Sequence, residues 1–531
     1  MSKLETKMHG FDIVSTVTQT TINKHFAALK RIKQIPDTLD FKLPRGLGTL
    51  TTKLLAPTVT LGLEGDRRKV LFSLNFAEGT FRALDDHDVL VEIPFGAARI
   101  GLLVDVDLAH LDVAGVPPAV RDAVKNLGDG MFSIRQLLLD FQNATVASYD
   151  PKHTTLPKEL LDDPLFIAGL TMLFRTFHEK GTNILGYAVT VKNPNDVAPD
   201  APTFPPTNLD FATRIYDAGG CNADLDSLDY LMMTEHRPLP GNVLPVGAFV
   251  DGESDGTMAI ARSVFVEGYL LPTLAKLTNR TSKFPYISWY DSSISTETGG
   301  AFIPNDGSFD IDDLVEPLRG LIASGNSFTP PPIPAPTTNA RCWSFLSHEE
   351  TTKTEGNEPI WGSNTVVRGL VSHACELRIT PGENTLELRG ACILSTSWTV
   401  WAGLVNFAMC EFHWLTSTLD WTASIRLIAD GSGHATARIT YEAKPVATEQ
   451  GGNWVAKIGN AMYTDQAHAQ IKNIETALKD GFGAEKLKAD LEAAFSKQNA
   501  FIFPGGQQYF FKDLVFNNDL DLLASLTIKF Y

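Results

Sequence analysis

Apolar and polar residues alternate along the chain between Leu520 and Phe530. A period of two is typical of a β-strand with one buried side and one side in water. We therefore predict a closing strand over residues 520–530, in a sheet with one buried face. Its apolar side is formed by Leu520, Leu522, Leu526, Ile528 and Phe530, with Leu523 as the exception.

The preceding segment, Thr464–Gln498, has the period of an amphipathic helix and is interrupted at Gly481-Phe482-Gly483. Two glycines at this place allow a helix to end and its axis to turn. We predict a kinked helix over 464–498, with one apolar stripe in each half and both stripes packed on the same curved sheet. The stripes are Ile471, Ile474 and Leu478 before the break, and Leu487 and Leu491 after it.

A helix is also predicted near the N-terminus, where apolar residues recur every three or four positions. Thr20 or Thr21 is its expected N-cap, and Pro36 ends the segment. The apolar stripe of this helix is Ile22, Phe26, Leu29 and Ile32. Further helical patterns cover Leu160–Phe177, Ala259–Leu277 and Asp313–Ala323.

Strand patterns outnumber helical ones, without the regular alternation of strand and helix that a parallel sheet needs. Two apolar alternations flank the turn sequence Pro381-Gly382-Glu383-Asn384, which has the length of a hairpin connection. A second hairpin is predicted around Asp430–Gly433. The sequence therefore indicates an α+β fold with an antiparallel meander that has one dry face. The alternating segments are 100–108, 185–191, 371–379, 386–394, 425–427 and 435–441.

The clearest internal boundary is proline-rich, with five prolines between Pro330 and Pro336. Proline cannot continue a helix or donate to a sheet, so this stretch favours a stiff polyproline II connector. We predict an N-terminal lobe over 1–329, a connector over 330–340, and a C-terminal lobe over 341–531 that holds the kinked helix and the closing strand.

Composition is that of a globular protein, with 531 residues of which 44% are hydrophobic and 20% charged. The net charge of −17 disfavours nucleic acid as a partner. The five cysteines have no C-x-x-C spacing, which indicates buried thiols rather than a zinc site. Neither a signal peptide nor a transmembrane stretch is visible, so we expect a cytoplasmic protein or one released by a non-classical route.

Catalytic and metal-binding patterns are weak. Gly252–Gly256 matches G-x-S-x-G, but Ser254 lies between two carboxylates that would oppose an oxyanion. We interpret the segment as an acidic turn. His373 and His413 stand alone in strand patterns, where a hydrogen-bonded histidine is expected rather than a metal ligand. We therefore expect no catalytic residue, no metal and no cofactor, and a protein that is not an enzyme.

Several short motifs resemble one family. The segment His9–Val14 and the following helix start Thr21-Ile22-Asn23-Lys24 are similar to the opening of the TULIP (tubular lipid-binding) proteins encoded beside clostridial neurotoxin genes, the OrfX-type accessory proteins and their insecticidal-toxin-associated relatives. The resemblance implies a long, strongly curved antiparallel sheet wrapped around amphipathic helices, in an elongated fold of one tube or two lobes. It also implies binding of lipids without catalysis. Further similar segments are Ile134–Phe141, Leu228–Met233, Phe265–Pro272 and Phe503–Gly506.

The leading hypothesis is a non-enzymatic binder of lipid or another hydrophobic ligand in an apolar groove, acting as an accessory component of a toxin complex with a protein partner. The alternative is a scaffold protein with a filled core that docks a protein partner. Basic residues near the first helix, among them Lys30 and Lys33, also suggest transient membrane contact. The expected apolar lining is Ile22, Phe26, Leu29, Ile474, Leu478, Leu487, Leu491, Leu522, Leu526 and Ile528.

Overall fold

The fold is described from a computed structural model in which the chain forms two compact units. Unit 1 comprises Met1–Ala261, Ala429–Ala435 and Ala493–Tyr531, and unit 2 comprises Arg262–Ile428 and Thr436–Glu492. The structure describes residues 3–42, 47–63, 67–84, 89–111, 132–139, 149–179, 182–191, 204, 206–216, 222–241, 243–281, 293–298, 302–305, 340–356, 363–404, 407–430, 435–452, 476, 484–496, 501–502 and 509–528.

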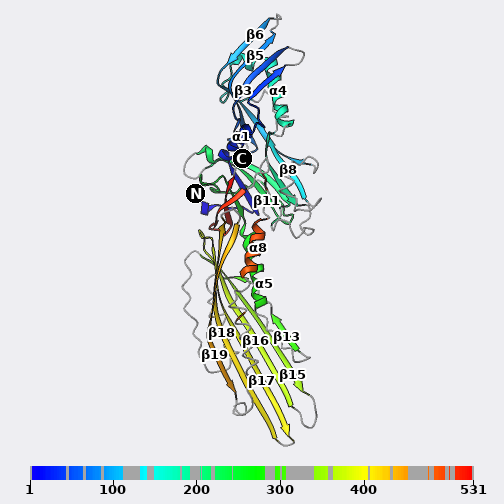
Figure 1. Ribbon diagram of the computed structural model, residues 1–531, viewed down its shortest axis with the longest axis vertical. Helices are drawn as coiled ribbons and strands as arrows, with labels where there is room; N and C mark the ends of the chain where they lie inside the picture. Colours follow the sequence, from blue (N-terminus) through cyan, green and yellow to red (C-terminus); the bar gives the residue numbers. More distant parts are fainter. Residues whose placement is uncertain are drawn as a thin grey trace. The chain divides into compact units, whose positions relative to one another are not determined.

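Unit 1 contains a six-stranded antiparallel sheet that includes strands from the first and the last part of the chain (Figure 1). The strand β1 (Ile13–Thr18) pairs with β12 (Gly256–Ile260), and β12 pairs on its other side with β22 (Leu522–Ile528). The remaining strands are β11 (Ser227–Met233) and β10 (Asn208–Arg214) beside β1, and β21 (Tyr509–Phe516) beside β22.

The closing strand is confirmed as β22, but two expectations about it are wrong. It belongs to the sheet of the N-terminal strands rather than to the C-terminal lobe. Its polar side is also not in water, since Ser525 is buried and its hydroxyl oxygen lies 2.6 Å from Nζ of Lys3. The N-terminal segment covers this side, so both faces of the strand are buried. The alternating pattern predicted the strand, but it did not predict that the N-terminal segment covers its polar side.

A second, nine-stranded sheet of unit 1 is organised around the 16-residue strand β5 (Lys69–Leu84). Along one edge β5 pairs with β4 (Thr58–Thr60) and β3 (Gly48–Leu54), and along the other with β7 (Ala98–Leu111) and β6 (Leu90–Phe95). The order continues outward through β2 (Thr38–Lys42) on one side, and through β8 (Phe132–Leu139), β9 (Ile184–Val191) and β20 (Phe501–Ile502) on the other.

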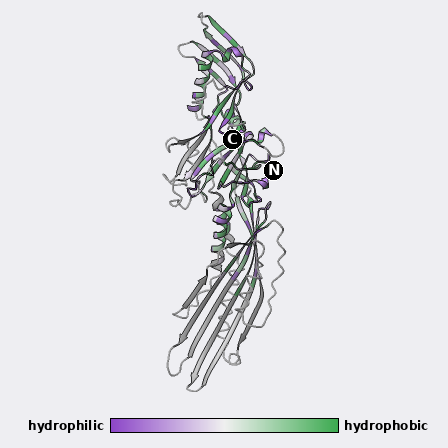
Figure 2. Cartoon of the chain, turned by 180° about the vertical axis from the view of Figure 1, so that it is seen from behind, coloured by the Kyte–Doolittle hydropathy of each residue, from purple (hydrophilic) through white to green (hydrophobic). Residues whose placement is uncertain are grey.

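Two helices pack on the aromatic residues of β5. The helix α1 (Gln19–Arg31) places Phe26 edge-on to Phe72, with ring centroids 6.2 Å apart. The helix α4 (Pro164–Glu179) places Phe174 against the same Phe72 ring at 6.4 Å. Figure 2 shows both hydrophilic and hydrophobic positions along α4. The predicted helix over 160–177 is thus present, divided into α4 and a short α3 (Lys158–Leu161).

The N-terminal helix starts earlier than the sequence indicated. Thr18 is the N-cap, because its side-chain oxygen accepts a hydrogen bond from the backbone N–H of Thr21 at 3.2 Å. The expected caps Thr20 and Thr21 are instead inside the first turn. Several threonines in a row offer the same capping chemistry, so the backbone geometry at the end of β1 decides among them.

Unit 2 is a meander of long antiparallel strands, as the hairpin patterns predicted. Its sheet has the order β13-β15-β16-β17-β18-β19, with β14 beside β15. The strands are β13 (Ser293–Thr298), β14 (Phe302–Asn305), β15 (Arg341–Gly356), β16 (Ser363–Ile379), β17 (Thr385–Leu404), β18 (Phe407–Ala429) and β19 (Ala435–Gly452). Figure 1 shows two helices, α5 (Leu271–Thr281) and α8 (Ala484–Ser496), next to each other beside this sheet.

The expected helix over 259–277 proved to be three elements. Residues up to Ile260 belong to β12, a π-helical segment, η7, covers Ser263–Leu270, and α5 follows it. The hydroxyl of Tyr269 in η7 donates to the carbonyl oxygen of Asp490 in α8 at 2.8 Å. This contact holds η7 and α8 together within unit 2.

Other sequence expectations are confirmed in part. The second half of the kinked helix is α8, whereas the break at 481–483 and nearly all of the first half lie outside the described residues. The proline-rich connector and the helix expected over 313–323 also lie outside them. The two units divide after Ala261. Antiparallel sheets with few helices confirm the α+β class.

Candidate functional site

The long strands of unit 2 carry apolar side chains in rows that cross the sheet. In one row Leu388 of β17 lies in register between Leu377 of β16 and Ala423 of β18. The rows on either side repeat this pattern, and their side chains are buried. We refer to these rows as the apolar face. Its members are Ile379, Leu386 and Ile425; Trp343, Leu377, Leu388 and Ala423; Phe345, Cys375, Gly390 and Trp421; and Ser347, His373, Cys392 and Leu419.

Burial keeps the ionisable groups of the apolar face uncharged near neutral pH. It lowers the pKa of His373 to about 3, because an imidazolium ion would lose its hydration. It raises the pKa of the Cys392 thiol to about 12 and that of Cys375 further still, with the Glu376 carboxylate adding to the shift at Cys375. These thiols are therefore poor nucleophiles, and the face offers apolar contact rather than chemistry.

The centre of the face is a histidine–tryptophan pair. Trp421 Nε1–H donates to Nε2 of His373 at 2.8 Å, and the two rings meet edge to face at 5.4 Å. Gly390 makes room for the indole, since a Cβ at that position would lie 2.3 Å from Cε2 of Trp421. The sequence predicted a hydrogen-bonded histidine at 373 but not its partner. The glycine inside an otherwise apolar alternation was the available signal.

Acid is expected to destabilise unit 2 through His373. The residue binds a proton near pH 6.5 when unfolded but only near pH 3 when folded, so the stability it contributes is complete above pH 6.5 and is lost as the pH falls below it. The expected loss is about 1.4 kcal/mol per pH unit in this window. Tryptophan fluorescence during urea unfolding at pH 7 and pH 5 would measure it, because all eight tryptophans fall in unit 2.

The control for this prediction is His373→Gln, whose side-chain oxygen can still accept from Trp421. The variant should retain the stability of unit 2 at pH 7 to within about 1 kcal/mol and lose the His373 part of the pH dependence. An identical pH slope in variant and wild type would contradict the assignment.

The residues expected to line an apolar interior are buried wherever the structure describes them. Ile22, Phe26 and Leu29 lie on α1, and Leu522, Leu526 and Ile528 lie on β22, all in unit 1. Leu487 and Leu491 lie on α8 in unit 2. The structure thus distributes them over both units. Ile474 and Leu478 lie outside the described residues.

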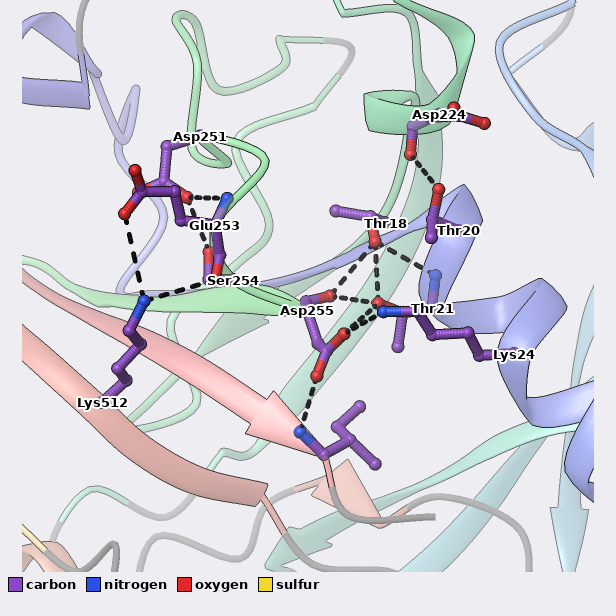
Figure 3. A network of polar contacts seen from close by, with 11 residues as sticks. Thr18, Thr20, Thr21, Lys24, Asp224, Asp251, Glu253, Ser254, Asp255 and Lys512 are labelled. Carbon is purple, nitrogen blue, oxygen red and sulfur yellow. Dashed lines mark hydrogen bonds and ion pairs between the residues drawn. The ribbon is translucent and has the colours of Figure 1, made fainter.

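The G-x-S-x-G segment forms an acidic loop (Figure 3). The hydroxyl of Ser254 donates to Oδ1 of Asp251 at 3.0 Å, and the backbone N–H of Glu253 donates to the same oxygen at 3.1 Å. Asp255 accepts from the Thr21 hydroxyl, from Nζ of Lys24 and from the backbone N–H of Ile528, at 2.9–3.2 Å. The loop therefore ties the start of α1 to the closing strand. The carboxylates of Asp251 and Asp255 are thus used as acceptors of hydrogen bonds within unit 1.

Two polar residues of the opening motif hold unit 1 together. The carboxylate of Asp12 is buried and accepts from the backbone N–H of Thr234 at 2.7 Å and from Arg237 at 2.8 Å. The side-chain amide of Asn23 makes two hydrogen bonds to the backbone of Val59, accepting at 2.7 Å and donating at 3.1 Å. These residues attach β1 and α1 to neighbouring strands, so their role is structural.

The described residues hold no group of three or more His, Cys, Asp or Glu side chains that could bind a metal ion. Within the same part of the chain, no helix is long and apolar enough to cross a membrane. Cys342, Cys375 and Cys392 are free thiols, as their spacing predicted.

Comparison with solved structures finds loose similarity over nearly the whole chain. P47 from Clostridium botulinum A2 aligns with a TM-score of 0.43 and 10% sequence identity, covering 98% of each chain. P47 of Clostridium botulinum E1 aligns with a TM-score of 0.43 and 13% identity, covering 98% of this chain and 99% of that one. A lipopolysaccharide binding protein aligns over 98% and 99% of the two chains at 12% identity and a TM-score of 0.28. No protein-family model and no curated protein matches the sequence.

Proposed function

We propose that unit 2 binds a hydrophobic molecule, such as the acyl chain of a lipid, along the apolar face of its sheet without converting it chemically. The observation that carries the proposal is the set of buried, uncharged side chains in these rows, with Arg341, in register with Ile379, as an exposed charged residue at the edge of the first row. An acyl chain gains roughly 25 cal/mol for each Å² of apolar surface removed from water and needs no polar partner. A charged substrate would find no counter-ion among these buried side chains.

The length of the strands supports an elongated ligand. Beyond the last row with described side chains, at Cys392, β17 continues for twelve residues to Leu404. At about 3.3 Å per residue, this extension spans about 40 Å. In the sequence of β17 the same phase continues with Leu394, Trp398 and Val400 and is interrupted by Thr396. A strand of this pattern and length is suited to a chain-like apolar molecule.

The motif resemblance to the TULIP proteins encoded beside neurotoxin genes supports the same function and extends it. On that basis we include in the proposal an accessory role in a toxin complex, with a protein partner. The opening motif on which the resemblance rests lies in unit 1, where Asp12 and Asn23 act structurally.

A scaffold with a filled core is the second candidate, and one observation favours it. The large side chains of the described rows are covered, and Trp421 is among the largest fully buried side chains. A core of this kind could serve only to stiffen a surface that docks a protein. The two candidates differ in whether a guest molecule reaches the apolar face.

Native mass spectrometry and organic extraction of the purified full chain test the proposal first. A released lipid, or a mass increase after incubation with stearate, is the expected result. Dibrominated stearate should also quench tryptophan fluorescence, because bromine quenches at short range and every tryptophan lies in unit 2. An unchanged mass together with unquenched fluorescence would overturn lipid binding and leave the scaffold.

Two neighbouring positions of β17 provide a matched pair of variants. In the two-residue period of β17, position 400 is in phase with Leu388 and Cys392, and position 399 is out of phase with them. Val400→Asp should weaken stearate binding at least tenfold, because a carboxylate on that side would have to be desolvated by the acyl chain. Thr399→Asp carries the same charge and should change binding less than twofold. Equal effects of the two would contradict the assignment of the face.

A further inference from the structure

One end of the nine-stranded sheet in unit 1 exposes an aliphatic cluster. Its five side chains are between 37% and 62% exposed, and Leu90 is the most exposed of them. They lie together, because Leu84 pairs with Leu90 across β5 and β6, and the backbone N–H of Leu84 donates to the carbonyl oxygen of Leu47 at 3.2 Å. We name this cluster the apolar tip, and its members are Leu47, Leu84, Val89, Leu90 and Val91.

The leucines of the apolar tip are not the rim of the core of unit 1, whereas Val91, in register with the buried Ala83, lies at the edge of the core side. Phe81 and Ala83, on the alternate positions of the same strand, are buried, and Phe81 packs against Phe166 of α4 at 5.5 Å. The core is therefore already covered by α4 at this end of β5. The exposed leucines lie on the other side of the strand, where the described residues leave them in water. Contiguous exposed apolar side chains of this kind mark an interaction surface.

The composition of the apolar tip favours a lipid surface over a protein. Binding hot spots between proteins are enriched in Trp, Tyr and Arg and poor in Leu and Val, whereas this cluster is entirely Leu and Val. Its geometry agrees, because the paired Leu84 and Leu90 face one side of the sheet and Val91 faces the other. A rigid partner would have to enclose both sides, while a fluid bilayer adapts to both.

The charges nearby select the kind of lipid. Behind the leucines, Arg82 and Glu92 form an exposed ion pair at 2.9 Å, which carries no net charge. The sequence that links β5 to β6, Asp85-Asp86-His87-Asp88, carries three carboxylates, and the sequence directly before Leu47 carries one cation, Arg45, so the two links together are net acidic. Anionic headgroups would be repelled, whereas the outermost group of phosphatidylcholine is a choline cation that attracts carboxylates.

We propose that the apolar tip is a docking surface for electrically neutral, phosphatidylcholine-type membranes, with its aliphatic side chains at the boundary between headgroups and acyl chains. Leu84 and Leu90 lie two residues beyond the Arg82–Glu92 pair, about 7 Å along the strands. Interfacial insertion is typically about 5–10 Å deep. The ion pair then remains among the headgroups. This surface lies in unit 1 and acts independently of a guest on the apolar face of unit 2.

Flotation of the full chain with phosphatidylcholine vesicles in a sucrose gradient tests the proposal. The wild type should float, and the double variant Leu84→Ser/Leu90→Ser should lose at least tenfold in vesicle affinity. Both residues are exposed, so the variant is expected to fold. The matched control is Leu55→Ser, since Leu55 is an equally large, exposed aliphatic residue of unit 1 outside the tip. Replacing part of the lipid with phosphatidylglycerol should weaken binding.

Three results would overturn the proposal. Wild-type protein that stays with the soluble fraction shows no docking, and equal losses for the tip and Leu55 variants show that the tip is not the surface. Self-association of the wild type that the double variant abolishes, without vesicle binding, would assign the tip to a second copy of the chain. Stearate binding is measured without vesicles, so failure here and failure of the proposed function are distinguishable.

Discussion

Replacing Gly256 by alanine is expected to destabilise unit 1 by about 3 kcal/mol, at the upper end of the range for overpacked cores. A Cβ at this position would lie 2.2 Å from the carbonyl oxygen of Thr16. That oxygen belongs to the backbone of β1, so it cannot turn away as the end of a flexible side chain could. The two central strands must separate, and β12 also carries the pairing with β22.

Hydrogen–deuterium exchange of peptides from β1 and β12 measures this effect, because unit 1 contains no tryptophan. A loss of this size should speed exchange through global opening roughly a hundredfold. The control is Gly96→Ala, since a Cβ at Gly96 meets nothing within 4 Å. It should leave exchange nearly unchanged. Similar exchange in both variants would show that β1 and β12 do not approach each other this closely.

Replacing Asp229 by alanine is expected to cost unit 1 about 3–5 kcal/mol, as is typical when one partner of a buried ion pair is removed. Asp229 lies on the interior strand β11, and its carboxylate accepts from Nε of Arg214 at 2.9 Å and from the Ser227 hydroxyl at 3.0 Å. Arg214 stacks over Phe249 at 4.8 Å and donates to the carbonyl oxygen of Gly247. Without the carboxylate, the largely covered guanidinium of Arg214, whose side chain is 15% exposed, is left without its counter-ion.

The same sheet offers a control with the same chemistry at the surface. Asp210 of β10 pairs with Arg68 at 2.7 Å, and Arg68 stacks over Phe211 at 5.0 Å. Because this pair is exposed to water, Asp210→Ala should cost at most about 1 kcal/mol. Chemical denaturation followed by far-ultraviolet circular dichroism, with exchange of β11 peptides, compares the two variants. Equal losses would mean that burial does not decide the contribution of the pair.

The periodicity of apolar residues predicted the helices and strands well, but it did not predict which strands pair with one another when they are far apart in the sequence. The alternation in 371–379 and 386–394 correctly gave a hairpin, because a short turn leaves adjacent strands only one way to pair. The closing strand was placed in the wrong sheet, since its partner β12 lies more than 250 residues earlier and no local pattern encodes such a pairing. Capping at Thr18 rather than Thr20 or Thr21 depended on backbone angles that residue types do not determine.

Candidate site residues were predicted as apolar positions but not as a site. Phe26 and Leu522 are buried, as a stripe and an alternation indicate, yet both lie in unit 1, whereas Leu491 lies in unit 2. An apolar position in the sequence predicts that the side chain is buried, but it does not indicate in which unit or against which element. The hydrogen bond between His373 and Trp421 could not be predicted from the sequence either. The two residues are 48 positions apart and are brought together by the register of three strands.

The pairing of β12 with β22 has a consequence for the order in which the protein is made. All of unit 2 lies between these two strands in the chain, so a ribosome completes unit 2 before it releases the strand that β12 requires. Until then the edge of β12 offers unpaired N–H and C=O groups to any strand that meets it. Unit 2 is free to form during synthesis, while the six-stranded sheet is finished only after translation reaches Leu522–Ile528.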